Sequence, residues 1–340
     1  MGQQQVFALL LAAQGEYLSG EAISKTLGVS RSAVWKSVAK LKEEGFVIDS
    51  VPNRGYSLLS APNRLDKISL AEKTREKMEA VFPEEAPLPS LDIRCFDSID
   101  STNTEVKRLA MTGAPEFLVV TAEEQTAGRG RQGKSFHSPS GTGIYLSILL
   151  RPQCKPEEAC HLTPWVAVAL AEAIETNCGL LPQIKWCNDL ILEGKKLSGI
   201  LCEISMESQG DFVEYVVIGI GLNVNQKMSD FPEELRSTAT SLCQISGKEL
   251  NRNHLCAEII TSVLHAYAQF PEKKDYFLEK YRENCLTLGS EVQVLSGEKR
   301  RTAMALEIDD EFRLLLRYDN GEEKAISAGE VSLRGMYGYI

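Results

Sequence analysis

A glycine-rich segment with three cations is the part of the sequence whose residue types and spacing best suit chemistry. Residues 127–147 read AGRGRQGKSFHSPSGTGIYLS. The stretch from Gly128 to Ser135 matches the nucleotide-binding pattern G-x-x-x-x-G-K-[ST], and it also contains G-x-G-x-x-G. Both patterns hold phosphate at the N-terminus of a helix. Here Pro139, two glycines and then a β-branched, aromatic run follow, which predicts a strand instead of a helix. Neither motif therefore applies.

What remains is a glycine-rich loop between two strands, and it carries Arg129, Arg131 and Lys134. Glycine lets the backbone approach a ligand closely, and three cations suit a triphosphate or an acyl phosphate. The alternative is a flexible, solvated basic loop without a ligand. The coincidence of several glycines with three cations favours a binding loop.

Further polar motifs accompany this loop in a fixed order along the chain. They are Ser101-Thr102-Asn103, then Gln125 just before the loop, then Lys185-Trp186-Cys187-Asn188-Asp189, Lys195 to Glu203 (KKLSGILCE) and Gly219-Ile220-Gly221-Leu222-Asn223. With the loop, they resemble the S-T-N, G-R-G-R-x-G, K-W-P-N-D, K-L-x-G-I-L-x-E and G-x-G-x-N motifs of the bifunctional biotin–protein ligases. These proteins are also biotin operon repressors and form part of the biotin–[acetyl-CoA-carboxylase] ligase family. The resemblance covers essentially the whole chain.

The resemblance implies an AMP-forming ligase. Such an enzyme activates biotin with ATP to biotinyl-5′-adenylate and transfers the biotinyl group to a specific lysine of a biotin carboxyl carrier protein. A carboxylate and a phosphate must meet in the first step, so fixed cations are needed to offset their repulsion. On the family's pattern, Lys196, Arg129 and Arg131 would be catalytic. Mg²⁺ would enter with ATP, without a metal site of the protein's own.

The same motifs imply which residues contact the two substrates. Asp189 would hold Mg²⁺ on the phosphates or orient Lys185, although an aspartate there is equally typical of a turn or a helix cap. The residues expected to contact biotin are Ser101, Thr102, Asn103, Gln125, Arg129, Gly130, Arg131 and Lys196. The residues expected to contact ATP are Lys134, Phe136, Lys185, Asn188, Asp189 and Asn223.

Three positions depart from the family's usual pattern. Cys187 stands where proline is usual, which loosens that turn and removes no functional group. Lys134 replaces a common arginine and so lacks its bidentate fork. Phe136 replaces a common tryptophan, so an adenine-stacking ring remains but offers less area.

The first 61 residues have the pattern of a winged helix-turn-helix. Ser19 and Ser30 are typical helix caps, and Gly28 suits the tight turn between two helices. The run FVIDSVPNRGYSLL then predicts two strands that form a wing. The residues expected to contact DNA are Ser30, Arg31, Ser32, Trp35, Lys36 and Arg54, which are phosphate and base-edge contact types. Trp35 alone is typical of half-buried packing. Winged helices also serve as dimerisation or protein-docking modules.

The distribution of charge favours DNA contact by the head rather than by the whole chain. The chain has a net charge of −10, whereas residues 1–64 carry seven Lys and Arg against five Asp and Glu. Nine cysteines without a C-x-x-C and four scattered histidines predict neither a disulfide framework nor a metal site. Reduced thiols, with no signal peptide and no membrane-spanning run, predict a cytoplasmic protein without membrane contact.

We therefore expect a multidomain α/β protein of four segments. They are a winged helix-turn-helix at 1–61, a linker at 62–90 with a charged helical stretch, a central α+β ligase domain with a mixed sheet at 91–286, and a small Src-homology-3-like β-barrel at 287–340. In the central domain, the runs EFLVVTAEE, GIYLSILL and YVVIGIGLNV predict strands, and residues 164–178 and 252–270 predict helices.

The expected partners are the carrier protein, operator DNA and, when the adenylate is bound, a second copy of the chain. One alternative is a biotin ligase whose N-terminal domain is not a repressor. A lipoate ligase is not expected to carry this loop or this head. A biotin sensor that no longer catalyses would have lost Arg129, Lys196 or Asp189, and all three are present.

Overall fold

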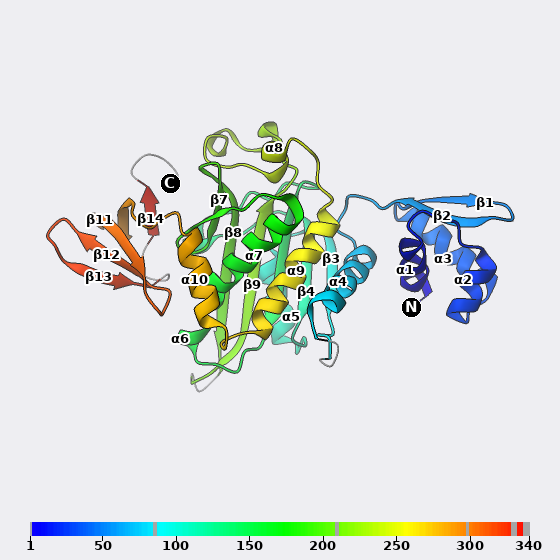
Figure 1. The fold of residues 1–340 in the computed structure, drawn as a ribbon, viewed down its shortest axis with the longest axis horizontal. Helices are drawn as coiled ribbons and strands as arrows, with labels where there is room; N and C mark the ends of the chain where they lie inside the picture. Colours follow the sequence, from blue (N-terminus) through cyan, green and yellow to red (C-terminus); the bar gives the residue numbers. More distant parts are fainter. Residues whose placement is uncertain (1, 84–86, 208–210, 297–298, 328–331, 336–340) are drawn as a thin grey trace.

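The computed structural model describes residues 2–83, 87–207, 211–296, 299–327 and 332–335. The molecule is elongated: an N-terminal head lies at one end, a sheet with helices forms the centre, and a smaller C-terminal sheet lies at the other end (Figure 1). Within the described residues, no helix combines the length and apolar character needed to cross a membrane.

The head consists of three helices and a hairpin. Ser19 and Ser30 each cap a helix by accepting a hydrogen bond from a backbone N–H three residues on, and Gly28 ends the second helix in the left-handed conformation with φ 64°. The head has an apolar core of its own. The predicted helix-turn-helix is confirmed. Its elements are α1 (Gly2–Ala12), α2 (Gly20–Leu27), α3 (Arg31–Glu43), β1 (Val47–Val51) and β2 (Gly55–Ser60).

A seven-stranded sheet forms the centre of the molecule. Its strands lie in the order β3-β4-β5-β9-β8-β7-β6, and β3 pairs with β4 in parallel while the other neighbours are antiparallel. The predicted mixed sheet is confirmed, and the three predicted strand runs form β4, β5 and β9. The strands are β3 (Asp92–Ile99), β4 (Leu118–Gln125), β5 (Gly143–Leu150), β6 (Gln183–Lys185), β7 (Asp189–Leu192), β8 (Lys195–Met206) and β9 (Val213–Asn223).

Helices cover both faces of this sheet. On one face α7 contacts β6, β7 and β8, α9 contacts β5 and α10 contacts β6 (Figure 1). Val216 and Ile218 of β9 belong to the apolar core on that face. On the other face α5 packs against Val217, because successive side chains of a strand point to opposite faces. The two predicted long helices are α7 and α9. The helices are α4 (Lys67–Val81), α5 (Thr102–Met111), α6 (Pro156–Ala159), α7 (Leu162–Cys178), α8 (Leu242–Ser246), α9 (Arg252–Ala268) and α10 (Lys274–Asn284).

The helical stretch expected in the segment 62–90 is present as α4, and it packs on both of its neighbours. Its helix α4 buries Leu70 and Met78 in the core of the central body and packs along α9. Ile68 packs against the core of the head. The charged composition suggests an exposed connector, but the spacing of Leu70 and Met78 places both on one buried stripe of the helix. Helix α4 is thus part of the folded structure that joins head and centre.

The C-terminal body is a five-stranded antiparallel sheet. Its strands lie in the order β13-β12-β11-β10-β14. Val292, Ala305 and Leu316 are among its buried side chains, and they continue the core of the central body. The strands are β10 (Glu291–Ser296), β11 (Lys299–Ile308), β12 (Leu314–Tyr318), β13 (Glu323–Ile326) and β14 (Ser332–Gly335).

Candidate active site

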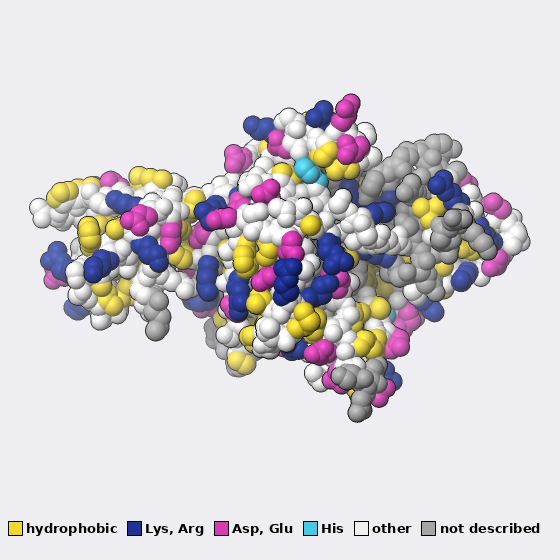
Figure 2. All heavy atoms as spheres, turned by 180° about the vertical axis from the view of Figure 1, so that it is seen from behind, with side chains coloured by type: hydrophobic (Ala, Val, Ile, Leu, Met, Phe, Trp, Pro, Cys, Tyr) yellow, Lys and Arg dark blue, Asp and Glu magenta, His cyan; other side chains and the backbone are white. Residues whose placement is uncertain are grey.

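A cavity of about 470 Å³ lies beside the N-terminus of α5 and under the glycine-rich loop. The face of the molecule opposite to that in Figure 1 carries a group of Lys and Arg side chains over the central body (Figure 2). The cavity brings together every residue that the sequence analysis assigns to biotin or ATP. These lining residues are Ser101, Thr102, Asn103, Gln125, Arg129, Gly130, Arg131, Lys134, Phe136, Lys185, Asn188, Asp189, Lys196 and Asn223.

A network of polar side chains forms one wall of the cavity. Gln125 Oε1 accepts hydrogen bonds from the backbone N–H of Thr102 at 2.9 Å and from its hydroxyl at 3.2 Å, while Gln125 Nε2 donates to Ser138 Oγ at 2.9 Å. The Ser147 hydroxyl contacts Thr102 Oγ1 at 2.7 Å and Asn103 Oδ1 at 2.6 Å. Because the end of β4, the start of α5 and β5 hold these groups together, their donors and acceptors are preorganised. Such a wall suits a small polar ring.

Two glycines of β9 make room for the cavity's side chains. A Cβ atom on Gly219 would lie 2.0 Å from Asn103 Oδ1, and one on Gly221 would lie 2.6 Å from the ring of Phe136. Both glycines face the same side of the sheet, since they are two residues apart on one strand. The Gly-x-Gly spacing therefore lets Asn103 and Phe136 lie directly on the strand's backbone. Ser101 begins α5 as its buried cap.

Cations and their partners form the opposite wall. Lys196 Nζ lies 2.8 Å from Asp189 Oδ1, and Arg131 Nη1 donates to Asn188 Oδ1 at 3.0 Å. Pairing of β7 with β8 brings the two motifs together. The side chains of Lys196 and Asp189 are 27% and 16% exposed, so solvent screens their charges less than it screens surface charges. This wall is suited to an anionic ligand.

Glu203 connects the glycine-rich loop to β8. Its carboxylate accepts hydrogen bonds from Lys107 Nζ at 2.7 Å and Asn103 Nδ2 at 2.9 Å, and it lies 4.0 Å from Arg129 Nη1. Burial opposes ionisation of Glu203, but the hydrogen bonds from Lys107 and Asn103 outweigh it and hold the pKa of this carboxyl below its ordinary value. Arg129 therefore has an ionised carboxylate beside it.

The glycine-rich loop contains no helix that could hold a phosphate. A single 3₁₀ turn at Arg131–Gly133 is its only helical element, with Gln132 at φ 53°. The N–H of Gly130 donates to the carbonyl of Lys134 at 2.7 Å, and the chain then enters β5 at Gly143. The interpretation of this segment as a loop between two strands is confirmed.

Trp186 connects the cavity to the C-terminal body, a role that the sequence analysis does not assign to it. Its backbone N–H donates to Thr287 Oγ1 at 2.9 Å, and its indole Nε1 donates to the carbonyl of Phe312 at 3.1 Å. Trp186 lines the cavity and is 5% exposed. Residues 287 and 312 therefore hold one part of the wall in place.

Cys187 is buried next to Trp186. Burial raises the pKa of its thiol to about 11, so the side chain is a neutral thiol near neutral pH. Its sulfur accepts a hydrogen bond from Arg131, and its carbonyl accepts one from Tyr281 Oη at 3.2 Å. The departure from the family's proline thus places a neutral thiol against a loop cation.

Residues 228–240 close another side of the cavity, and the sequence analysis does not identify them. They contain two short 3₁₀ helices, η2 (Met228–Asp230) and η3 (Glu233–Leu235). The N–H of Lys196 donates to the carbonyl of Thr238 at 2.8 Å. The N–H of Thr240 donates to the carbonyl of Lys196 at 2.9 Å. The backbone of this segment is mostly irregular, so its sequence has neither the periodic pattern of a helix or strand nor a motif.

Asp189 supplies the one carboxylate among the described residues that line the cavity. Over the described part of the chain, no group of three or more His, Cys, Asp or Glu residues could hold a metal ion. A single carboxylate is a poor metal site by itself, but Mg²⁺ commonly binds through one or two carboxylates and the phosphates of a nucleotide. The donors therefore fit a cation that arrives with its nucleotide.

The head presents its expected DNA-contact residues from α3 and from the hairpin. Arg31, Ser32 and Lys36 are exposed, whereas Val34 on the same helix is buried in the head's core. Ser30 caps α3 and also contacts the Ser32 hydroxyl.

Trp35 differs from the expected half-buried packing. It is 61% exposed, because it lies on the side of α3 that faces away from the head's core.

Arg54, the expected DNA-contact residue of the hairpin, has its guanidinium over the ring of Tyr17, 4.1 Å from the ring's centre.

Family models match all three bodies. The Biotin/lipoate A/B protein ligase family matches residues 95–223, an HTH domain matches residues 3–57, and the Biotin protein ligase C terminal domain matches residues 287–334. The fold and the cavity thus define a protein of the biotin ligase class with a helix-turn-helix head.

Similar proteins place the chain more narrowly. It is 35% identical to "Bifunctional ligase/repressor BirA" of Bacillus spizizenii over 96% of this chain and 97% of that protein, and 34% identical to the protein of the same name from Bacillus subtilis with the same coverage. The structure "Biotin protein ligase from Aquifex aeolicus in complex with biotin and ATP" is similar with a TM-score of 0.62 and 31% identity, covering 72% of this chain and 99% of that one. The chain belongs to the bifunctional ligase/repressor family.

Proposed function

We propose that this protein activates biotin with ATP and transfers the biotinyl group to a lysine of a biotin carboxyl carrier protein. One observation carries the proposal: a single cavity joins a preorganised polar wall to a wall of cations. The polar wall suits biotin's ureido ring, and the cationic wall suits a carboxylate next to a triphosphate.

The reaction has two chemical steps, and the cationic wall would act in the first of them. In the first, an oxygen of the biotin carboxylate bonds to the α-phosphorus of ATP and pyrophosphate leaves. In the second, the deprotonated amine of the carrier lysine attacks the acyl carbon of the adenylate, and AMP leaves. Lys196, Arg129 and Arg131 would act in the first step, because fixed positive charge offsets the repulsion of two anions and stabilises the charge that develops on phosphorus.

The remaining cavity residues would bind and orient the substrates. Ser101, Thr102, Asn103, Gln125 and Gly130 would contact biotin, and Lys134, Phe136, Lys185, Asn188 and Asn223 would contact ATP. Asp189 would reach Mg²⁺ carried by the phosphates. When bound, Mg²⁺ neutralises part of the phosphate charge.

The glycine-rich loop would also protect the intermediate. Biotinyl-adenylate is a mixed anhydride that water hydrolyses. Arg129 lies at 50% side-chain exposure beside Glu203, so it is positioned at the mouth of the cavity rather than deep inside it. Closure of the loop over the adenylate would exclude solvent until the carrier lysine arrives.

The head would make the protein a biotin-responsive repressor of biotin biosynthesis genes. The exposed residues of α3 would enter the major groove, and the β1–β2 hairpin would act as a wing that carries Arg54 to the DNA backbone. A dimer formed on adenylate binding would place two heads on a two-fold operator, and unbiotinylated carrier would compete with that dimer.

The C-terminal sheet would form a small Src-homology-3-like barrel. The domain borders would lie near residues 61, 91 and 287.

A mass-shift assay tests the ligase. A carrier domain incubated with this protein, biotin, ATP and Mg²⁺ should gain the mass of one biotinyl group, and it should gain nothing when ATP is left out. An unchanged carrier mass in the complete mixture would refute ligase activity.

A gel shift tests the head. DNA from upstream of the biotin biosynthesis genes should bind more tightly when biotin and ATP are both present. Binding that ignores biotin and ATP, or no binding at all, would support the alternative of a ligase whose N-terminal domain is not a repressor.

A further inference from the structure

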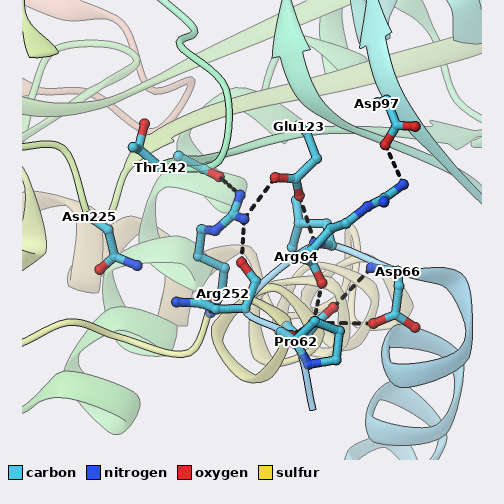
Figure 3. A network of polar contacts seen from close by, with 12 residues as sticks. Pro62, Arg64, Asp66, Asp97, Glu123, Thr142, Asn225 and Arg252 are labelled. Atoms are coloured by element: carbon cyan, nitrogen blue, oxygen red, sulfur yellow. Dashed lines mark hydrogen bonds and ion pairs between the residues drawn. The ribbon is translucent and has the colours of Figure 1, made fainter. Parts of the chain in front are cut away.

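A buried ion pair between Arg252 and Glu123 lies outside the set of residues that line the cavity (Figure 3). Arg252 is the first residue of α9 and is 1% exposed, and its Nη2 lies 2.8 Å from Oε2 of Glu123 on β4. Two charges this deeply buried are costly unless further hydrogen bonds satisfy them. The partners that supply those bonds therefore indicate what the pair holds together.

The first set of partners belongs to the segment that connects the head to the centre. Arg252 Nη2 donates to the carbonyl of Asn63, and Glu123 Oε1 accepts from the N–H of Leu65 at 2.7 Å. The connecting segment is thus bonded to both members of the ion pair.

The second set of partners belongs to the end of the glycine-rich loop. Arg252 Nη1 donates to the carbonyl of Gly143 at 3.1 Å, and the carbonyl of Glu123 accepts from the N–H of Gly141 at 3.2 Å. Gly143 is the first residue of β5 after the loop, and Glu123 lies two residues before Gln125 of the cavity wall. The ion pair is therefore bonded on both sides of the loop.

Other contacts hold the connecting segment along α9. Asn253 Oδ1 accepts from the N–H of Asp66 at 3.2 Å, and Asn253 Nδ2 donates to the carbonyl of Pro62 at 3.3 Å (Figure 3). The backbone N–H of Arg252 donates to Asn63 Oδ1 at 3.0 Å. Helix α4 follows directly, with Ile68 against the core of the head. A shift of this segment would therefore move the head.

We infer that Arg252 and Glu123 are positioning residues that couple the state of the glycine-rich loop to the position of the head. The inference rests on the proposed function, in which the loop closes over the adenylate. Closure would act on residues 141–143, where Arg252 bonds the carbonyl of Gly143 and the backbone carbonyl of Glu123 accepts from Gly141. Arg252 Nε is already buried without a hydrogen-bond partner, so loss of the Gly143 acceptor would leave a second donor unsatisfied; movement of Gly143 would therefore displace Arg252, and residues 63–65 with it.

Hydrogen exchange on the full chain tests this coupling. Amide exchange is measured with and without biotin, ATP and Mg²⁺ in peptides that cover residues 126–142 and residues 62–66. Both peptides should exchange about tenfold more slowly when the substrates are present. Protection of the loop without any change at 62–66 would overturn the coupling and leave the proposed function intact. No protection of the loop would refute its closure and the coupling with it, while the mass-shift assay tests the ligase separately.

Paired substitutions identify the residues that carry the coupling. Arg252→Met with Glu123→Gln removes both buried charges, which is far less destabilising than leaving one of them unpaired. In this double variant the loop should still gain protection, while residues 62–66 should lose the response. The matched control is Lys77→Met with Glu258→Gln, since that pair also joins α4 to α9 and its side chains are 20% and 15% exposed.

The control pair should keep the response of residues 62–66 to the substrates. An equal loss of response in both double variants would show that general loosening, not this ion pair, is responsible. Should the first double variant fail to fold, Arg252→Lys keeps a positive charge next to Glu123 but lacks the fork that reaches Glu123, Asn63 and Gly143 together, and the same loss of response at 62–66 is expected. A retained response in that variant would contradict the inference.

Discussion

Replacing Lys196 by alanine should slow formation of biotinyl-adenylate about a hundredfold. The Lys196 ammonium lies 2.8 Å from Asp189 Oδ1 in a partly buried wall, where an effective dielectric constant of about 20 applies. A unit charge about 4 Å from a phosphate oxygen then contributes about 4 kcal/mol. If about two thirds of this acts only in the transition state, the loss is about 2.7 kcal/mol, which corresponds to a factor of about 100 in rate.

Biotin-dependent exchange of labelled pyrophosphate into ATP measures this step directly. Lys195→Ala is the matched control, because it removes the same charge from the neighbouring residue of β8, which does not line the cavity. The control should keep nearly the parent rate, and thermal unfolding should show that both variants remain folded. A Lys196→Ala rate within about threefold of the parent would refute the electrostatic role, because it would leave less than 1 kcal/mol for the charge.

Other changes test other parts of the molecule. Arg129→Gly should speed dissociation of biotinyl-adenylate more than it slows its formation, so that free adenylate labels unrelated lysines; an unchanged dissociation rate would contradict a sealing role for the loop. Gly219→Ala should raise the Kd for biotin at least about tenfold, because its Cβ would lie 2.0 Å from Asn103 Oδ1 and displace it; titration calorimetry measures this Kd, and parent affinity would show that the position of Asn103 is not needed. Trp35→Ala should weaken operator binding about tenfold and leave adenylation unchanged, because the ring is 61% exposed on α3 and lies in the head; an equal loss of both activities would point to misfolding. The buried Cys187 thiol, with a pKa of about 11, should react with iodoacetamide more slowly than the exposed Cys160 at pH 8, and its rate should rise with pH as thiolate forms; mass mapping of the labelled residues decides it.

Helices, turns and strands whose ends depend only on neighbouring residues can be predicted from the sequence. Ser30 at a helix start and Gly28 at a helix end predict the head's turn, since capping depends on neighbouring residues alone. The strand from Gly143 to Leu150 is predicted with its observed bounds, because eight residues with β-branched and aromatic side chains follow a breaker-rich loop. The ordered motifs, through the resemblance to the ligase family, predict part of the cavity's lining, including Gln125 and Lys196.

Tertiary contacts determine what the sequence does not predict. The helical stretch at residues 69–80 was expected, but its packing was not, because the partner that buries Leu70 and Met78 is α9, far along the chain. The wall at 228–240 has irregular backbone, which leaves no periodic pattern to detect. Trp35 was expected half-buried, and only the packing of α3 on the head's core shows that it faces outward.

The hydrogen bonds of Trp186 have a consequence for the order in which the protein is made. Its partners, Thr287 and the carbonyl of Phe312, lie 101 and 126 residues further along the chain. During synthesis, the head and the polar wall emerge from the ribosome long before these partners, and domains generally fold in that order. The helix-turn-helix head of a nascent chain can thus fold while the residues that hold Trp186 in the cavity wall are not yet synthesised. Translation that stops before residue 312 would leave a fragment with a complete head but without the Phe312 carbonyl that holds the Trp186 indole in the cavity wall.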